Sequence, residues 1–271
     1  VLTIILLGYI IGLISGPDYF WFILIFATIF STAYTIFGYY NSHKVALSSV
    51  KATKASRAQY PQYHNSIEGL CLASGMPKPN LYIMRSNTIN AFASGRNPKN
   101  SVICITTGAL QQLNKQELEG VLAHELSHIA NYDIRFMTLT AVLVGMVSII
   151  AQIFLRSLWW NSITGKRNNN NSSIIFMIIG IALAILAPIF TMLVQLAISR
   201  KREFSADASA VKFTRTPTGL IGALKKIKNN KPIKVTSSLS PLFIASPSKK
   251  FSGFFQTHPN LEKRIEILQK M

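Results

Sequence analysis

Long apolar runs dominate the pattern along the chain, and their lengths match membrane helices rather than core helices. The runs 19–40 and 174–199 contain no charged residue, and a transmembrane helix needs about 20 apolar residues. A third run, 138–160, includes Arg156, which can lie near a helix end and reach the headgroup region. The run 1–15 is shorter, and we interpret it as the second half of another helix. The pattern therefore predicts four transmembrane helices.

The distribution of basic residues predicts the orientation of these helices. Of the 28 Lys and Arg residues, ten lie within 41–136 and fifteen within 199–271. Because cytoplasmic segments beside membrane helices are enriched in Lys and Arg, we expect both segments on the cytoplasmic side. Lys166 and Arg167, in the predicted external loop, weigh mildly against this orientation.

The net charge of +18 is consistent with either anionic lipid or nucleic acid as a partner. The basic residues flank membrane segments, where anionic headgroups attract them, and they are not interleaved with aromatic residues as in RNA-binding proteins. We therefore expect contact with a lipid bilayer and no nucleic-acid partner. The two cysteines, Cys71 and Cys104, are too few for a disulfide framework, and we expect free, buried thiols.

The apolar runs also divide the chain into segments. Residues 1–40 would carry two transmembrane segments, and residues 138–198 two more, joined by a short external loop. The first part of a cytoplasmic domain would occupy residues 41–137, and the second part residues 199–271.

The two cytoplasmic segments predict a mostly helical α+β fold with a small β-sheet. Residues 80–84 and 101–107 have the composition of short strands, and 89–93 is a candidate third strand. Asn114 followed by Glu117 forms a capping-box pattern, which predicts a helix that continues to residue 131. Further helices are expected over 65–74, over 199–213 and near the C-terminus, and a long basic loop over 225–250.

The helix predicted after Asn114 carries His124, Glu125 and His128 in a metal-binding arrangement. Histidines four residues apart lie on the same face of a helix, so their nitrogens can converge on a zinc ion. A carboxylate directly after the first histidine can reach a metal-bound water without binding the metal. Because the chain has five histidines, a chance pair on a surface helix is the alternative.

A catalytic zinc site usually has three protein ligands and a water. Glu203, in the second predicted helix, is the candidate third ligand. Asp207, one turn later, could accept a hydrogen bond from a ligand imidazole. Ordinary ion pairs with the basic residues at 200–202 are the alternative for both acids. Asp133 and Glu117 lie too close to the first helix to close the site well.

Five motifs in a fixed order resemble a known family. They are "ASGMPKPNLYIM", "INAFASGRNPKNSVICITTGAL", "LEGVLAHELSHIANYDI", "SRKREFSADASA" and "THPNLEKRI". Together they resemble the membrane-embedded M48 zinc metallopeptidases, in particular the HtpX-like branch. The resemblance implies a multi-pass membrane protein with a zincin-like (HExxH) metallopeptidase domain. It also implies one Zn²⁺ per chain, with His124, His128 and Glu203 as ligands and Glu125 as catalytic base.

The resemblance also suggests residues that bind the substrate. Asn90, Ala91 and Phe92 would belong to a strand beside the cleft that can pair with an extended peptide, although a core strand is the alternative. The late "HP…R" element suggests that His258 or Arg264 lies near the substrate carbonyl. A turn that caps the final helix is the alternative for that element.

These implications define the function that we expect. The chain would be a zinc metalloendopeptidase in the cell (plasma or inner) membrane, with its catalytic domain on the cytoplasmic side. Its partners would be polypeptide substrates, in particular misfolded membrane proteins. A CAAX prenyl-protein protease-like enzyme and a catalytically silent membrane scaffold are the alternatives. Four transmembrane segments argue against the first alternative, and the complete set of metal ligands argues against the second.

Overall fold

The computed structural model describes residues 17–137, 200–229 and 259–271, together with Ile5, Tyr9, Ala182 and Leu186. The chain divides into two compact units, one of residues 1–41 and 145–190 and one of residues 42–144 and 191–271. Apart from those four single positions, the predicted transmembrane runs 1–15, 138–160 and 174–199 lie outside the described residues.

Helix α2, Pro17–Ser49, contains the second predicted transmembrane run. Within it, Asp18–Asn41 has 24 residues and a mean hydropathy of 1.9, which makes it the one segment among the described residues long and apolar enough to cross a membrane. Phe22, Phe26 and Phe30 stack along one side of this helix at four-residue spacing. The stacked aromatic rings are largely exposed, as expected for a helix surface that faces an apolar solvent.

The predicted small sheet is present and has four strands in the order β1-β2-β4-β3. Strand β2 pairs in parallel with β4, and β3 pairs antiparallel with β4. Among the described residues, β3 is therefore an edge of the sheet, and it extends the predicted third strand to Asn97. The strands are β1 (Thr53–Lys54), β2 (Asn80–Met84), β3 (Ala91–Asn97) and β4 (Asn100–Thr106).

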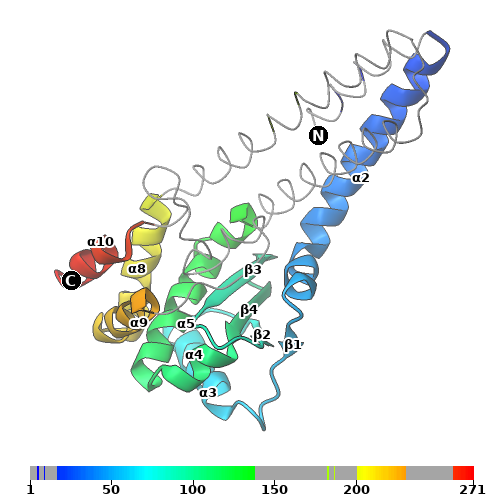
Figure 1. The fold of residues 1–271 in the computed structure, drawn as a ribbon. Coiled ribbons are helices and arrows are strands. Elements are labelled where there is room, and N and C mark those ends of the chain that lie inside the picture. Colours follow the sequence, from blue (N-terminus) through cyan, green and yellow to red (C-terminus); the bar gives the residue numbers. More distant parts are fainter. Residues whose placement is uncertain are drawn as a thin grey trace, which may run out of the picture. The chain divides into compact units, whose positions relative to one another are not determined.

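Helices surround a central helix, α5, and confirm the predicted mostly helical α+β architecture (Figure 1). Residues 120–129 of α5 are all buried, because α3, α8, α9 and β3 all pack against this helix. A helix that is buried on every side belongs to the core. The helices are α3 (Pro61–Ser74), α4 (Thr107–Gln112), α5 (Lys115–Ala130), α8 (Arg200–Thr214), α9 (Thr218–Asn229) and α10 (Leu261–Leu268).

Two sequence expectations about element bounds need correction. Helix α3 begins at Pro61, four residues before the expected start, because proline is well suited to the first position of a helix. Residues 225–229 continue α9 instead of opening a basic loop, because Leu224 and Ile227 pack into the core. The rest of that predicted loop, 230–250, lies outside the described residues.

The first turn of α5 is fixed by the predicted capping box. The backbone N–H of Glu117 donates to Asn114 Oδ1 at 2.9 Å, and the backbone N–H of Asn114 donates to Glu117 Oε2 at 2.8 Å. Lys226 on α9 also donates to Glu117 Oε2, at 2.6 Å. The start of the histidine-bearing helix is thus tied to its neighbour in the core.

Both cysteines are free and buried, as expected. Burial raises the pKa of the Cys71 thiol to about 11 and that of the Cys104 thiol to about 12. The thiols therefore stay protonated at neutral pH, and neither cysteine belongs to the group of metal-binding side chains described below.

Close approach of α5 and α9 at Gly120 makes this glycine a test of the core. A Cβ atom there would clash with the backbone nitrogen of Leu220. We expect Gly120→Ala to lower the free energy of unfolding by about 1–3 kcal/mol, as overpacking typically does. Gly69→Ala is the control, because nothing lies within 4 Å of a Cβ on this glycine. That control should keep or raise stability by up to about 1 kcal/mol. Thermal unfolding of the purified variants measures both, and equal stabilities would contradict the close contact.

Candidate metal centre

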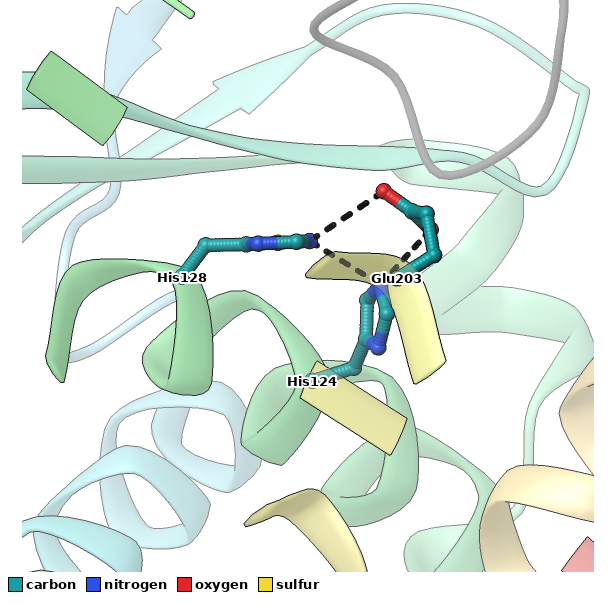
Figure 2. A group of neighbouring side chains, drawn as sticks. All are labelled: His124, His128 and Glu203. Atoms are coloured by element: carbon teal, nitrogen blue, oxygen red, sulfur yellow. Dashed lines mark hydrogen bonds and ion pairs between the residues drawn. The ribbon is translucent and has the colours of Figure 1, made fainter. Parts of the chain in front are cut away.

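Three side chains from two helices converge in the core. Helix α5 supplies His124 and His128, whose Nε2 atoms lie 3.2 Å apart. Helix α8 supplies Glu203, whose carboxylate oxygens lie 3.7 Å from Nε2 of His124 and 3.6 Å from Nε2 of His128. Figure 2 shows the two imidazoles and the carboxylate directed toward one another. All three residues are buried, and one potential ligand atom of each lies within 4.8 Å of the others.

Two further carboxylates fix the orientation of the histidine rings. Nδ1 of His124 lies 3.0 Å from Oδ1 of Asp207, and Nδ1 of His128 lies 3.1 Å from Oδ2 of Asp133. Because an ionised carboxylate can only accept hydrogen bonds, each Nδ1 carries the proton in these pairs. In the neutral imidazole the Nε2 atom then has a free lone pair, which is the form that binds metals.

The spacing and chemistry of these atoms fit a zinc ion. Two nitrogens bound at about 2.0–2.1 Å in a tetrahedral site lie roughly 3.3 Å apart, close to the 3.2 Å between the two Nε2 atoms. Two imidazoles and one carboxylate also leave a fourth position, as in catalytic zinc sites. The residues present therefore suit a metal that acts in catalysis.

The charges around His128 favour a cation at this place. Burial lowers the pKa of His128, but the hydrogen bond to Asp133 and the charge of Glu203 outweigh it and raise the value to about 9. Burial is the main cause that lowers the pKa of His124 to about 4. A proton and a metal ion compete for the same lone pair of a histidine. The attraction that raises the pKa of His128 would equally attract a divalent metal.

Glu125 lies beside the three converging residues without being one of them. Its carboxylate is buried and accepts a hydrogen bond from the backbone N–H of Ala93, on strand β3. Burial raises the pKa of Glu125 to about 7. This residue therefore connects the metal-binding helix to the edge strand of the sheet.

Arg264 on α10 is the largest fully buried side chain among the described residues. Its Nε donates to Oδ2 of Asp207 at 2.8 Å, and its Nη2 donates to Oδ1 at 2.6 Å. Its Nη1 lies 3.4 Å from Oε2 of Glu203. The guanidinium group thus contacts both acidic residues of α8 that face the histidines.

The structure brings together most, but not all, of the residues singled out in the sequence. Asn90 precedes β3 and pairs with Thr106, which donates its backbone N–H to the Asn90 carbonyl at 3.0 Å. Ala91 and Phe92 lie buried in β3. His258 lies outside the described residues. The residues gathered at the centre are His124, Glu125, His128, Glu203, Asp207 and Arg264.

Sequence reasoning missed the contribution of Asp133. This residue lies just beyond the end of α5, after Tyr132, whose positive φ of 59° turns the chain back toward the helix. Helical spacing gives no signal for a residue after a helix end, so the sequence pattern does not predict a role for Asp133. It serves instead as the partner of His128, and Arg202 on α8 lies 3.8 Å from its other oxygen.

A core helix that carries His124, Glu125 and His128, joined by Glu203 from a second helix, has the side-chain arrangement of zinc metallopeptidases. Comparison with known proteins specifies which kind. Residues 57–271 match the sequence profile of peptidase family M48. The chain belongs to this family, and the predicted enzyme class, a zinc metallopeptidase, is confirmed.

Relatives in sequence share a name with the branch that the motifs resemble. The chain is 44% identical over 253 residues to the protease HtpX homolog of Caldanaerobacter subterraneus subsp. tengcongensis, covering 92% of this chain and 84% of the relative. It is 38% identical over 282 residues to the protease HtpX homolog of Listeria monocytogenes serotype 4a, covering 99% and 92%. The predicted resemblance to HtpX proteases is therefore confirmed.

A solved structure shares the fold. The crystal structure of S. mikatae Ste24p matches with a TM-score of 0.53 at 22% identity, covering 98% of this chain. This chain spans 61% of the length of that one. At this level of identity the similarity supports a common fold alone.

The two outer carboxylates generate a prediction about metal affinity. We expect Asp133→Asn and Asp207→Asn each to weaken zinc binding about 10–100-fold, because each removes the acceptor that orients a ligand histidine. Competition with a chelator measures the affinity. Glu262→Gln is the control, since this acid pairs with Lys228 at an exposed position. Zinc release that matches the wild type in both aspartate variants would show that these pairs are only structural.

Proposed function

We propose that the protein is a zinc-dependent endopeptidase that holds one Zn²⁺ per chain through His124, His128 and Glu203. The observation that carries this proposal is the convergence of two Nε2 atoms and a carboxylate in the core. Zinc bound there supplies a Lewis acid for the scissile carbonyl and lowers the pKa of a bound water. The remaining chemistry belongs to residues of the chain.

Glu125 is the proposed general base. It is adjacent in sequence to a ligand histidine, and the N–H of Ala93 orients its carboxylate. From this position it accepts a proton from the attacking water and passes it to the leaving amine. A carboxylate with a pKa near neutrality suits both transfers, because it can take up and release a proton at the working pH. No covalent intermediate is needed.

Strand β3 is the proposed binding site for an extended substrate. Asn90, directly before β3, pairs with Thr106, at the end of β4: the Thr106 N–H donates to the Asn90 carbonyl, and the Asn90 N–H donates to Thr106 Oγ1. In an antiparallel ladder hydrogen-bonded pairs alternate with non-hydrogen-bonded pairs, so the backbone groups of Ala91 and Ala93 point away from β4. Their N–H groups contact Asn90 Oδ1 and the Glu125 carboxylate, and we propose that their carbonyl groups pair with the peptide. A peptide that adds to this edge as a further strand would pass beside Glu125.

The neighbours of this edge strand have proposed roles as well. Asn90 Oδ1 accepts from the N–H of Ala91 at 3.0 Å, which keeps the start of the edge ordered. Phe92 packs in the smaller of two hydrophobic clusters, and this packing holds β3 in place. We retain His258 as a candidate contact of the substrate carbonyl, on the basis of the family resemblance.

Polypeptides are the substrates of a peptidase, and we propose that misfolded membrane proteins are the natural ones here. The apolar segment of α2, in the same chain as the metal centre, supports this proposal. An extended strand as the bound form also requires substrates that are locally unfolded. The names of the similar relatives favour an HtpX-type protease over a CAAX prenyl-protein protease-like enzyme.

The roles of the two glutamates can be separated by measurement. Glu203→Ala should lower the zinc content, because a three-ligand site becomes a two-ligand site. Glu125→Gln should keep about one zinc per chain and lose nearly all activity against unfolded casein. Glu119→Gln is the control, on the same helix but outside the site. Full zinc content in Glu203→Ala would refute the ligand assignment, and an active Glu125→Gln variant would refute the base. Equal cleavage of a folded protein would argue against locally unfolded substrates.

We further propose that the chain is anchored by four transmembrane segments, two within 1–40 and two within 138–198. The segments 41–137 and 199–271 would then form one catalytic domain on the cytoplasmic side of the cell membrane. The apolar segment of α2 and the 25 basic residues, ten and fifteen, in the two polar segments support this arrangement. Anionic headgroups would attract those residues.

Reporter fusions test this topology. Reporters fused after Lys54 and after residue 215 should lie on the same side of the membrane, because both follow segments rich in Lys and Arg. A reporter within 168–171 should lie on the opposite side. If the first two reporters lay on opposite sides, His124 and Glu203 could not share one metal, and the proposed arrangement would be wrong.

A further inference from the structure

We propose that Arg264 is a positioning residue of the metal centre, which holds Asp207 and Glu203 in the orientation that His124 and the metal require. Helix α10 would thereby be a working part of the centre rather than a terminal addition to the fold. The inference rests on the proposed zinc site. It assigns to Arg264 a role directed at the protein's own carboxylates, not at the substrate.

The contact between Arg264 and Asp207 is the first support. Two guanidinium nitrogens donate to the two oxygens of one carboxylate, at 2.8 and 2.6 Å. A bidentate pair of this kind fixes the plane of the carboxylate as well as its position. Nδ1 of His124 lies 3.0 Å from the same Oδ1 of Asp207. Arg264 therefore determines where the acceptor for the ligand histidine lies.

The third nitrogen of the guanidinium forms an ion pair with the carboxylate of Glu203. Nη1 lies 3.4 Å from Oε2 of Glu203, and both side chains are almost completely buried. Glu203 and Asp207 are one helical turn apart on α8, so their charges repel each other when both are ionised. A buried charge is stable only when it is paired. The Arg264 cation compensates part of this charge and lets two acids occupy one face of a buried helix.

Docking of α10 does not depend on the arginine alone. Leu268 is completely buried, and Leu261 and Ile265 pack against the core. These residues and Arg264 share one face at helical spacing. Asn260 caps the helix by accepting the N–H of Glu262 at 3.0 Å. Apolar contacts thus seat the helix, and Arg264 can be changed without removing them.

Arg264 could instead repel the metal ion, so the direction of the change in zinc affinity distinguishes the two effects. Nη2 of Arg264 lies 3.4 Å from Nε2 of His124, so the guanidinium charge lies close to the metal position. If repulsion between two cations were its main effect, removal of Arg264 would strengthen zinc binding. If Arg264 positions the carboxylates, removal would weaken zinc binding.

The experiment compares the zinc affinities of the full chain and its variants by competition with a chelator. Arg264→Gln should bind zinc at least about tenfold more weakly than the wild type, the lower end for loss of a group that supports metal ligands. Arg264→Lys, which keeps the charge but not the bidentate geometry, should lie between the two. Lys263→Gln, an exposed neighbour on α10 with the same loss of charge, should match the wild type. Equal or tighter binding by Arg264→Gln overturns the inference.

A double-mutant cycle tests whether Arg264 acts through Asp207. Zinc affinity is measured for Asp207→Asn, for Arg264→Gln and for the double variant. If Arg264 acts through Asp207, the loss of zinc affinity in the double variant should be smaller than the product of the losses in the two single variants. A loss in the double variant equal to that product would overturn the inference. If Arg264→Gln does not fold, Arg264→Lys replaces it in the cycle. A wild-type chain that binds no zinc would refute the proposed function itself, which distinguishes the two failures.

Discussion

The pairing of buried charges between α5, α8 and α10 is the constraint on which the rest of the structure depends. Nδ1 of His124 pairs with Asp207, and Nδ1 of His128 pairs with Asp133. An arginine lies beside each of these two carboxylates, Arg264 beside Asp207 and Arg202 beside Asp133. Groups of this kind are stable in a core only when every partner is held in place. The packing around α5 therefore has to be tight, because a shift of one helix would leave a charge without its partner.

Several local features provide that tightness. The capping box and Lys226 fix the first turn of α5, and Gly120 lets the backbone of α9 approach closely. Strand β3 reaches the same centre from the other side, since the N–H of Ala93 contacts Glu125. A site supported in this way from helices and a strand is held more precisely than one built on loops. Metal binding and substrate alignment would then use the same rigid elements.

The elements that follow local rules could be predicted from the sequence. The strands at 80–84 and 101–107 were predicted within one residue, and the helix after Asn114 was predicted from its capping box. The start of α3 was predicted four residues too late, because proline suits a helix start. Helix α9 was not predicted, and burial of Ile227 places residues 225–229 in this helix instead of the expected basic loop. Local patterns did not place β3 at the sheet edge, because strand order depends on pairing between distant segments. Only the family resemblance suggested a strand that can pair with a peptide.

The sequence by itself determined the part of the centre that lies within one helix. His124, Glu125 and His128 are placed by helical periodicity, which is a property of consecutive residues. Only the tertiary structure decided which carboxylate serves which histidine. Asp207 reaches His124, whereas Asp133, beyond the helix end, reaches His128. Arg264 joins Asp207 and His124 from positions 57 and 140 residues away along the chain. No local pattern encodes such contacts, because they exist only once apolar burial has packed α8 against α5 and α10 against α8 and α9.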